Sequence, residues 1–548
     1  PAAGVSPVVT GSSASAIIKL NGADNVTIDG SNSGASDKSL TIENTNTGTS
    51  AIVVWVASAS STDGATNNTI KNTIVKGGSS AALAGIMSSS GTTAGGVAEA
   101  SNANLTIQNN TVMKAYYGIS VAGNATYQTG LSIIGNTIGS DITAEKIGFN
   151  GIFVSNNDNP NISNNSIFNI TVSSSINVAG ITVGAGVING TIISNRIEKI
   201  KSTSTSGYGA YGINFSSATG TTGTLVANNM ISNIETANYS TTSLTWNAFG
   251  IRVGAAIPNL KFYNNTVNMY GNVTSGSSAG MSANFVTTAA ATNIDMRNNI
   301  FRNVQSFATS GSSAYNVYLY SGTTFTDINY NNYVGATSTN TTYRLGYNGS
   351  ANVADLAAWQ TYTTKDLNSV AIAPNFVSNT DLHLATGTNT SLDNIGTPIA
   401  AVSTDIDGDT RSATPDMGAD EFSTLYCGEP AIAGTLTATP ASLCTSGSAT
   451  IAATGYMTGV GTTYEWESAT DAEFTTPVSM GAASSNYANI ATGNITATAY
   501  YRLKVTCLTG TPVYSTPVAV VVNTPAVTTV SPAITVCTGD STTLTAGG

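Results

Sequence analysis

The sequence predicts an all-β fold, in which a right-handed parallel β-helix solenoid is followed by an immunoglobulin-like β-sandwich. Three observations lead to this prediction. A short motif built around Asn, which we call the first phrase, recurs along most of the chain, and a second motif, the second phrase, is built around Gly and alternates with it. Near the first cysteine a different residue pattern begins. No useful length of the chain shows helical periodicity, which argues against a helical repeat protein.

The first phrase places an apolar residue on each side of an Asn or an Asn-Asn pair. Clear copies occupy residues 107–112, 133–138, 162–167 and 192–197, and later copies are centred on Asn229, Asn265 and Asn299. When the second Asn is the marker, successive copies lie 26, 29, 30, 34, 36 and 34 residues apart. A period in this range is typical of stacked repeats.

The spacing inside the phrase predicts a corner at the Asn. The two flanking apolar residues are five positions apart, so in a straight strand they would point to opposite faces. Both are apolar in nearly every copy, and we therefore expect the chain to bend between them so that both point inward. Asn tolerates left-handed backbone angles and suits such a corner. Stacked corners would align the Asn amides into a hydrogen-bonded ladder.

The second phrase is a Gly followed by apolar residues two positions apart, a pattern that indicates a strand with one buried face. Copies begin at Gly118, Gly151, Gly180, Gly212 and Gly250, and residues 316–319 resemble a copy in which Asn replaces the Gly. We expect the Gly to mark a sharp turn into each strand. Two or three short strands in each turn predict about a dozen coils, stacked at about 4.8 Å into a solenoid roughly 55 Å long.

The expected domain layout follows these patterns. We assign residues 1–423 to the β-helix with its terminal cap, and interpret residues 381–422 as the closing coil and the cap. Residues 427–523 are assigned to a β-sandwich, and residues 524–548 to the start of a second, truncated one.

The four cysteines all lie in the C-terminal part of the chain. Cys444, Trp466 and Cys507 have the order and rough spacing of an immunoglobulin-like sandwich. We therefore expect a disulfide between Cys444 and Cys507, with Cys537 paired beyond the sequence and Cys427 unassigned. Cysteines clustered in small β domains fit an oxidising compartment.

Composition restricts the partners and the location. Only 9% of the residues are charged, and the formal net charge is −11. A neutral polar surface on a long β stack suits an extracellular or cell-surface protein, and the negative charge disfavours nucleic acid and anionic membranes as partners. No apolar run reaches the length of a membrane span. We interpret the sequence as an internal or processed stretch of a longer secreted polypeptide.

Several segments resemble a known group of proteins. Residues 21–32 and 40–44 resemble the opening coils of β-helix surface proteins of Bacteroidetes-type bacteria, and residues 405–419 look like the closing coil of the same group. The segment from Cys444 to Cys507 is similar to their tandem immunoglobulin-like repeats. The resemblance implies an adhesin-like repeat protein that is exported by the type IX secretion route and displayed on the cell surface or released.

The sequence contains few candidate catalytic residues. The single histidine, His383, excludes a pair of histidine metal ligands within this chain, and we expect it to have a structural role in the closing coil. A β-helix polysaccharide lyase or glycosidase would need a base or paired carboxylates. The acids of the middle coils are isolated, and we expect the arginines there to be outward, solvated charges: Glu198, Glu235, Asp295, Arg196, Arg252, Arg297 and Arg302.

Two weaker signals concern ligands. Asp405, Asp407 and Asp409 alternate and Asp416 lies eleven positions after the first, a spacing of hard oxygen ligands that could hold calcium. Gly408 departs from the EF-hand pattern, and the alternative is a tight turn in which Arg411 pairs with an Asp. The second signal is a set of aromatic residues in the lengthened middle loops: Tyr208, Tyr239, Trp246 and Tyr270. These could stack on sugar rings, or instead pack over Gly-rich loops.

Taken together, these patterns favour a non-catalytic extracellular surface module of an adhesin-like protein. Its β-helix would present loops to carbohydrate or to another cell-surface component, and its immunoglobulin-like domains would act as spacers. Calcium is the one cofactor that the sequence suggests. The alternatives are a carbohydrate-active enzyme that uses the β-helix groove, and a purely structural stalk or filament component.

Overall fold

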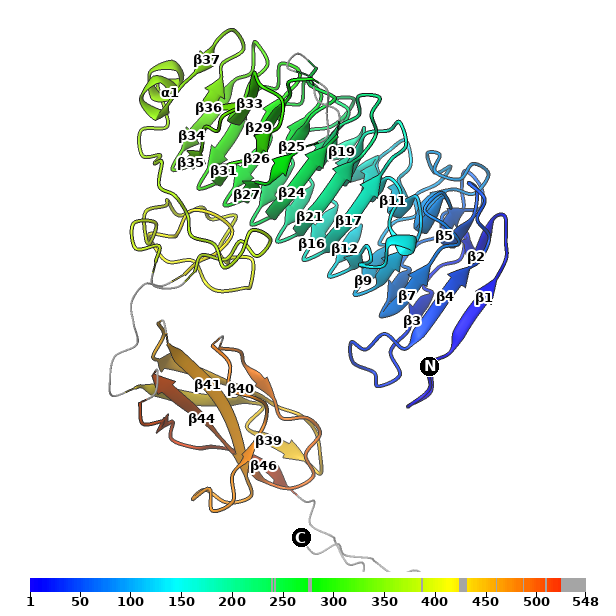
Figure 1. Cartoon of the computed structure of the whole chain (residues 1–548). Helices are drawn as coiled ribbons and strands as arrows, with labels where there is room; N and C mark the ends of the chain where they lie inside the picture. The colour runs from blue at the N-terminus through cyan, green and yellow to red at the C-terminus, as the bar shows by residue number, and fades with distance from the viewer. Residues whose placement is uncertain are drawn as a thin grey trace, which may run out of the picture. The chain divides into compact units, whose positions relative to one another are not determined.

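The computed structural model describes the chain apart from residues 238–239, 241–242, 275–277, 386–387, 423–430, 460, 486, 508–509 and 524–548. The chain divides into two compact units, Pro1–Phe422 and Ser423–Gly548 (Figure 1). In the described parts of both units the regular secondary structure is almost entirely β-strand. Among the described residues, no helix combines the length and the hydropathy that a membrane span requires.

The first unit is a parallel β-solenoid whose coils contribute strands to three sheets, which we name A, B and C (Figure 1). Sheet A has 11 strands: β1 (Val8–Gly11), β4 (Leu40–Asn44), β7 (Thr73–Lys76), β10 (Thr111–Met113), β13 (Thr137–Ile138), β17 (Ser166–Val172), β21 (Arg196–Ser202), β24 (Met230–Thr236), β27 (Thr266–Met269), β31 (Ile300–Asn303) and β35 (Asn332–Gly335).

Sheet B has 12 strands: β2 (Ala16–Asn21), β5 (Ile52–Ser58), β8 (Ala84–Ser90), β11 (Tyr117–Ala122), β14 (Asn150–Ser155), β18 (Val178–Val183), β22 (Ala210–Phe215), β25 (Ala248–Val253), β29 (Met281–Thr287), β33 (Ser312–Tyr318), β36 (Thr341–Tyr347) and β37 (Asn352–Val353). All its pairings are parallel except that of β36 with β37. The parallel solenoid predicted from the repeat is thus confirmed.

Sheet C has 10 strands: β3 (Thr27–Asp29), β6 (Thr69–Lys71), β9 (Thr106–Gln108), β12 (Ser132–Ile134), β16 (Asn161–Ser163), β20 (Thr191–Ile193), β23 (Leu225–Ala227), β26 (Lys261–Tyr263), β30 (Ile294–Arg297) and β34 (Phe325–Asn329). Two small sheets pair β15 (Asn157–Asp158) with β19 (Val187–Ile188) and β28 (Asn272–Val273) with β32 (Ser306–Phe307). A 3₁₀ turn, η1, spans Thr143–Glu145.

The Asn phrase forms the corner between sheets C and A. Its first position takes the left-handed backbone conformation, with φ values of 51° at Asn109 and 56° at Asn164. Its second position carries the ladder, since each Asn amide donates to the side-chain oxygen of the Asn in the next coil. These Nδ2···Oδ1 distances are 2.9–3.0 Å along Asn110, Asn136, Asn165, Asn195, Asn229, Asn265, Asn299 and Asn331. Both features were predicted from the sequence and are confirmed.

The Gly of the second phrase does not mark the expected turn into a strand; it is required by the packing between sheets. Gly118 and Gly180 lie inside strands of sheet B, β11 and β18. A Cβ atom at Gly180 would lie 2.5 Å from Ile197 Cγ2 of sheet A, so the packing between sheets leaves room for no side chain. Asn316 fills the matching position of β33, and its amide donates to Phe301 O (2.9 Å). Residues 316–319 are therefore a later copy of the phrase, as the sequence indicated.

The C-terminal end of the solenoid core is covered by a short helix, α1 (Leu356–Thr363). Asp355 caps it by accepting a hydrogen bond from Ala358 N (3.0 Å). Trp359 is fully buried in the solenoid core, and its Nε1 donates to Asp366 Oδ2 (2.8 Å). Tyr333 donates to the same oxygen (2.7 Å). Burial of the core end by Trp359 shields it from edge pairing with another chain.

Residues 365–422, which we name the strap, run back along the outside of the solenoid instead of stacking as the expected closing coil (Figure 1). Outward Asn amides at the corners hold its backbone: Asn298 Nδ2 donates to Thr397 O (2.7 Å) and Asn228 Nδ2 donates to Thr404 O (2.6 Å). Beneath it, Met230 and Ile300 pack against strap residues such as Leu382 and Leu384. The strap therefore covers the outer face of sheet A from β24 to β31.

The second unit contains two sheets around one core. A three-stranded antiparallel sheet comprises β38 (Ala433–Thr439), β40 (Thr450–Tyr456) and β43 (Ile490–Ala491). The larger sheet comprises β39 (Ser442–Cys444), β46 (Val518–Asn523), β44 (Ala499–Cys507), β41 (Thr462–Ala469), β42 (Val478–Ser479) and β45 (Val513–Tyr514). Ile451, Trp466 and Leu503 are buried between them.

The expected disulfide between Cys444 and Cys507 is wrong. Cys444 is an exposed free thiol, whereas Cys507 is buried and disulfide-bonded. The strand register explains the difference: Cys444 ends β39 beside Asn523, while Cys507 ends β44 opposite Thr462 of β41. The order Cys-Trp-Cys was thus insufficient to pair them. Cys427 and Cys537, and the expected second sandwich, lie outside the described residues.

Candidate functional site

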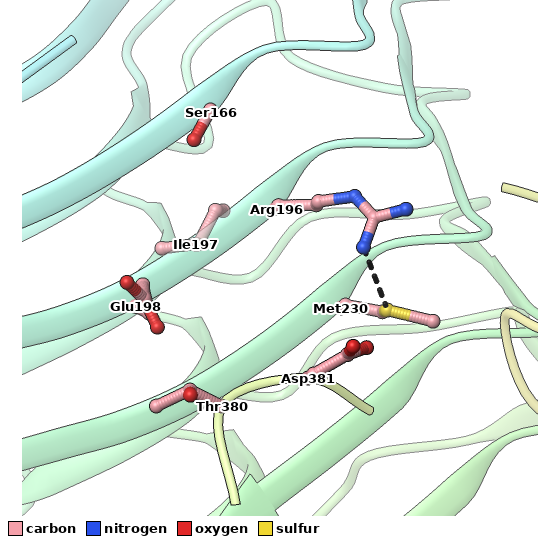
Figure 2. Close-up of a pocket in the computed structure, with 7 residues that line it drawn as sticks. All are labelled: Ser166, Arg196, Ile197, Glu198, Met230, Thr380 and Asp381. Carbon is pink, nitrogen blue, oxygen red and sulfur yellow. Dashed lines mark hydrogen bonds between the residues drawn. The ribbon is translucent and has the colours of Figure 1, made fainter. Parts of the chain in front are cut away.

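A small cavity of about 220 Å³ opens where the strap crosses sheet A. Its lining residues are Ser166, Arg196, Ile197, Glu198, Met230, Thr380 and Asp381 (Figure 2). Ser166, Arg196 and Met230 are in register on β17, β21 and β24, so they form one outward row across three coils. Thr380 and Asp381 come from the strap, and Figure 2 shows them on the opposite side of the cavity from Ser166. The cavity therefore exists only because the strap is in place.

The single histidine lies beside this cavity in a cluster of ion pairs. His383 Nδ1 contacts the Asp381 carboxylate, and Nε2 lies 2.7 Å from Asp407 Oδ2. Arg196 donates to the other oxygen of Asp407 (2.8 Å). The bond to Asp407, together with that to Asp381, raises the pKa of His383 to about 9 although burial opposes this. The imidazole is therefore protonated at neutral pH and unsuited to act as a general base.

His383, Asp407 and Asp420 also form a group that could hold a metal ion, the one such group among the described residues. One ligand atom from each lies within 4.8 Å of the others. One nitrogen and two carboxylate oxygens suit a borderline cation such as zinc more than calcium, which takes six to eight oxygens. In the structure these atoms instead form bonds within the strap, including that of Leu384 N to Asp420 Oδ2 (2.7 Å), and Asp407 also pairs with Arg196 of the solenoid.

Of the four residues predicted to bind calcium, only Asp407 belongs to that group. Asp405 Oδ1 accepts backbone N–H groups of Asp407 (2.9 Å) and Asp409 (2.8 Å), as a turn residue does. Asp416 accepts the backbone N–H groups of Asn394 (2.6 Å) and Phe422 (2.8 Å), and burial raises its pKa to about 8. Asp405 thus forms a tight turn, as the alternative supposed, but Asp416 lies outside that turn, and calcium binding stays a prediction.

Two of the four arginines of the middle coils, Arg196 and Arg297, acquire acidic partners in the fold. Arg411 pairs with Glu421 (3.1 Å), not with an Asp as the alternative to calcium supposed. Arg297 pairs with Asp295 (2.8 Å), and Arg196 pairs with Asp407 through the strap. The pair of Arg411 lies within the strap, that of Arg297 joins neighbouring positions, and that of Arg196 joins the solenoid to the strap, so the geometry gives all three a structural role.

The predicted aromatic residues lie on one edge of the solenoid. Tyr208, Trp246 and Tyr270 occupy loops that follow β21, β24 and β27 in three successive coils, while Tyr239 lies outside the described residues. Trp246 is 46% exposed and its ring lies over Gly207, where an added Cβ would be 2.8 Å from Cδ2. Burial and the charges of nearby acids raise the pKa of Tyr270. Trp246 thus packs on a glycine and still presents a face to solvent.

Sequence reasoning missed an apolar cluster on the outer side of sheet B, in addition to the solenoid core. Tyr211, Phe249 and Tyr315 form a cluster separate from the solenoid core. Arg252, expected to be solvated, is 9% exposed there and lies 5.0 Å from the Tyr211 ring centroid. The signal that could have found this surface is the aromatic residue immediately before the Gly of the phrase, as at Tyr211 and Phe249.

The comparisons with known proteins concern the second unit. A family model described as a domain of unknown function (DUF8696) matches residues 432–524. These residues contain the two sheets of that unit, so the match carries no information about the solenoid. No curated protein matches the chain.

Proposed function

We propose that this chain is a non-catalytic extracellular surface module, in which the solenoid binds carbohydrate through its edge loops and the second unit acts as an immunoglobulin-like spacer. The observation that carries the proposal is the half-exposed Trp246 on a loop supported by a rigid stack of coils. A large planar side chain with little conformational freedom is suited to contact with the apolar face of a sugar ring. The adhesin-like, type IX-exported character implied by the resemblance belongs to this proposal.

The His383 cluster supports a non-catalytic role. A protonated imidazole held between Asp381 and Asp407 stabilises the strap internally, and Arg196 of the solenoid occupies the other oxygen of Asp407. A glycosidase would instead keep a proton donor and a second carboxylate available to substrate.

The test measures binding and cleavage together. The full chain is incubated with a panel of neutral and acidic polysaccharides, and affinity gel electrophoresis is combined with an assay for new chain ends. We expect retardation by at least one polysaccharide without new ends, and about tenfold weaker binding for Trp246→Ala, equivalent to about 1.4 kcal/mol.

The matched control for that variant is Tyr362→Ala. Tyr362 is an exposed aromatic residue on α1, away from the edge loops, and we expect its replacement to leave binding unchanged. New chain ends would show an enzyme and overturn the proposal. Absence of binding to every polymer would favour a structural stalk.

A further inference from the structure

The geometry of sheet B points to a more specific ligand: we propose that the outer face of this sheet binds an anionic polysaccharide, one that bears carboxylate or sulfate groups, along the axis of the solenoid. The inference rests on the proposed carbohydrate-binding function and names the class of polymer and the surface. The surface, named the sheet B face, comprises outward residues of four strands from β22 to β36. Tyr318, Arg344 and Tyr347 are partly exposed, so the accessible part of the face is centred on β33 and β36. The other five are at most 9% exposed: Tyr211, Asn214, Phe249, Arg252 and Tyr315.

The first observation is the sign of the charges. The 12 strands of sheet B contain Lys19, Arg252 and Arg344 but no Asp or Glu. Sheets A and C carry acids on several strands, for example Glu198 and Asp295. The chain as a whole has 29 acidic and 18 basic residues. A purely cationic sheet in an acidic chain favours a negatively charged partner at that face.

The second observation is that Arg252 lacks a counter-ion. Its Nη1 donates to Asn214 Oδ1 (2.9 Å), its Nη2 to Thr288 Oγ1 (3.4 Å) and its Nε to Leu244 O (3.3 Å), all neutral acceptors. Among the described residues, no carboxylate lies within ion-pair distance of Arg252 or Arg344. Burial lowers the pKa of Arg252, which reflects the unfavourable desolvation of its charge. An anionic group that approaches this guanidinium would offset that desolvation.

The third observation is an aromatic platform beside Arg344. The rings of Tyr318 and Tyr347 are stacked in adjacent coils with centroids 4.4 Å apart, and both rings are partly exposed. Tyr315 lies edge-on to Tyr318, with centroids 5.2 Å apart. Arg344 is in register with Tyr315, and the side-chain acceptor that it has among the described residues is Ser313 Oγ (2.7 Å). Stacked rings beside a cation suit a sugar ring that carries an acid group.

The fourth observation is spacing. Arg252 on β25 and Arg344 on β36 are three coils apart, because β29 and β33 lie between them. At about 4.8 Å per coil, this places the two cations roughly 14 Å apart along the axis. The register places Arg252 in the row of Tyr318 and Tyr347, and Arg344 in the row of Tyr315, three residues away along the strand. A regular polymer that follows the axis obliquely would therefore meet both cations. A single acidic sugar could not reach both.

The Trp246 loop connects this surface to the edge site. Leu244 O and Thr245 O accept hydrogen bonds from Arg252 and Tyr211 respectively, so the loop forms one wall of the sheet B face. A polymer on the platform would therefore pass beside the Trp246 loop. The contact between loop and face also explains why Arg252 is held in one position.

The experiment uses the full chain and polymers of defined charge. Polygalacturonate supplies carboxylates, dextran sulfate supplies sulfates, and unmodified dextran is neutral. We compare Arg344→Gln, Arg252→Gln and Tyr347→Ala with the control Arg302→Gln. Arg302 is also a partly buried arginine that donates to an Asn (Asn268 Oδ1, 2.8 Å), but it lies on sheet A.

We expect binding to at least one anionic polymer that weakens with added salt. Each sheet B variant should bind at least tenfold more weakly, and the control should be unchanged. Comparison of polygalacturonate with dextran sulfate shows which acid group is recognised. Thermal unfolding and circular dichroism of each variant identify a loss that comes from misfolding, and Arg344→Lys, which keeps the charge, should restore part of the binding if the protein is folded.

The remaining outcomes separate this inference from the function on which it rests. Equal binding of neutral and anionic polymers that is abolished by Trp246→Ala but not by the arginine variants would overturn the sheet B proposal and keep the carbohydrate-binding function. Equal loss with Arg302→Gln would show a diffuse charge effect and overturn the sheet B proposal. No binding to any polymer would overturn both.

Discussion

Replacing one rung of the buried Asn ladder should destabilise the solenoid far more than the loss of one side chain suggests. Asn195 is fully buried, and its Nδ2 donates to Ile162 O (2.9 Å) and to Asn229 Oδ1 (3.0 Å). Its Oδ1 accepts from the backbone N–H (3.0 Å) and from the side-chain amide (2.9 Å) of Asn165. One amide therefore connects three successive coils.

The magnitude follows from the groups that Asn195→Ala leaves unpaired. Asn165 N–H loses its acceptor, and Ile162 O, in a strand paired on both sides, loses the hydrogen bond from the amide. Asn229 Oδ1 still accepts the backbone N–H of residue 195 (3.0 Å). A buried group without a partner costs about 1–3 kcal/mol. One such group, together with the lost side-chain hydrogen bonds and a small cavity, should lower the free energy of unfolding by about 2–4 kcal/mol.

Urea denaturation of the full chain, followed by circular dichroism, measures this change, and hydrogen exchange locates it. In a solenoid each coil contacts only its neighbours, so lost protection should centre on residues 162–167, 192–197 and 226–231. The control is Asn340→Ala, whose side chain makes one exposed hydrogen bond, to Ala308 O (2.7 Å), and should change stability by less than about 0.5 kcal/mol. A loss below about 1 kcal/mol for Asn195→Ala would refute the reasoning.

Three further changes test other parts of the fold. The bond to Asp407 raises the pKa of His383 to about 9. The stabilisation that protonated His383 gives the strap is therefore fully present below about pH 6.5 and is lost as pH rises through 9. Hydrogen exchange in the strap, corrected for intrinsic rates, should accelerate between about pH 7 and 10, and unchanged protection would contradict this. Gly180→Ala should destabilise by about 1–3 kcal/mol, measured by urea denaturation, because its Cβ would lie 2.5 Å from Ile197 Cγ2; a neutral effect would show that the sheets can separate. Trp359→Ala should cost about 3–5 kcal/mol and promote aggregation, measured by thermal unfolding with light scattering; a monodisperse variant of normal stability would show that α1 is not a cap.

The sequence predicted the corners and the ladder because both depend on neighbours in the same short phrase. The spacing between Ile107 and Val112 requires a bend, and the bend requires a residue such as Asn109 that tolerates a left-handed conformation. These constraints repeat in each coil, so the period displays them. The parallel solenoid was predictable for the same reason.

The strap and the disulfide were not predictable, because each depends on contacts between distant parts of the chain. Met230 and Ile300 occupy outward positions where earlier coils have Thr111 or Ser166, and nothing within one coil shows that a later segment will cover them. Cys444 likewise has the expected order relative to Trp466, but strand register places it at the edge of the sheet.

The outer faces of sheets A and B are used differently, and this difference favours sheet B as the surface that meets a partner. On sheet A the corner amides, for example Asn228, bind the strap backbone, and Met230 is covered by apolar strap residues. A ligand there would have to displace a segment held by ion pairs and by an apolar contact. On sheet B, Tyr347 remains partly exposed and Arg344 lacks a carboxylate partner among the described residues. The chain supplies no carboxylate partner for the arginines of this aromatic face among its described residues. An external anionic ligand explains such a face better than stability does, since an unpaired buried cation lowers stability.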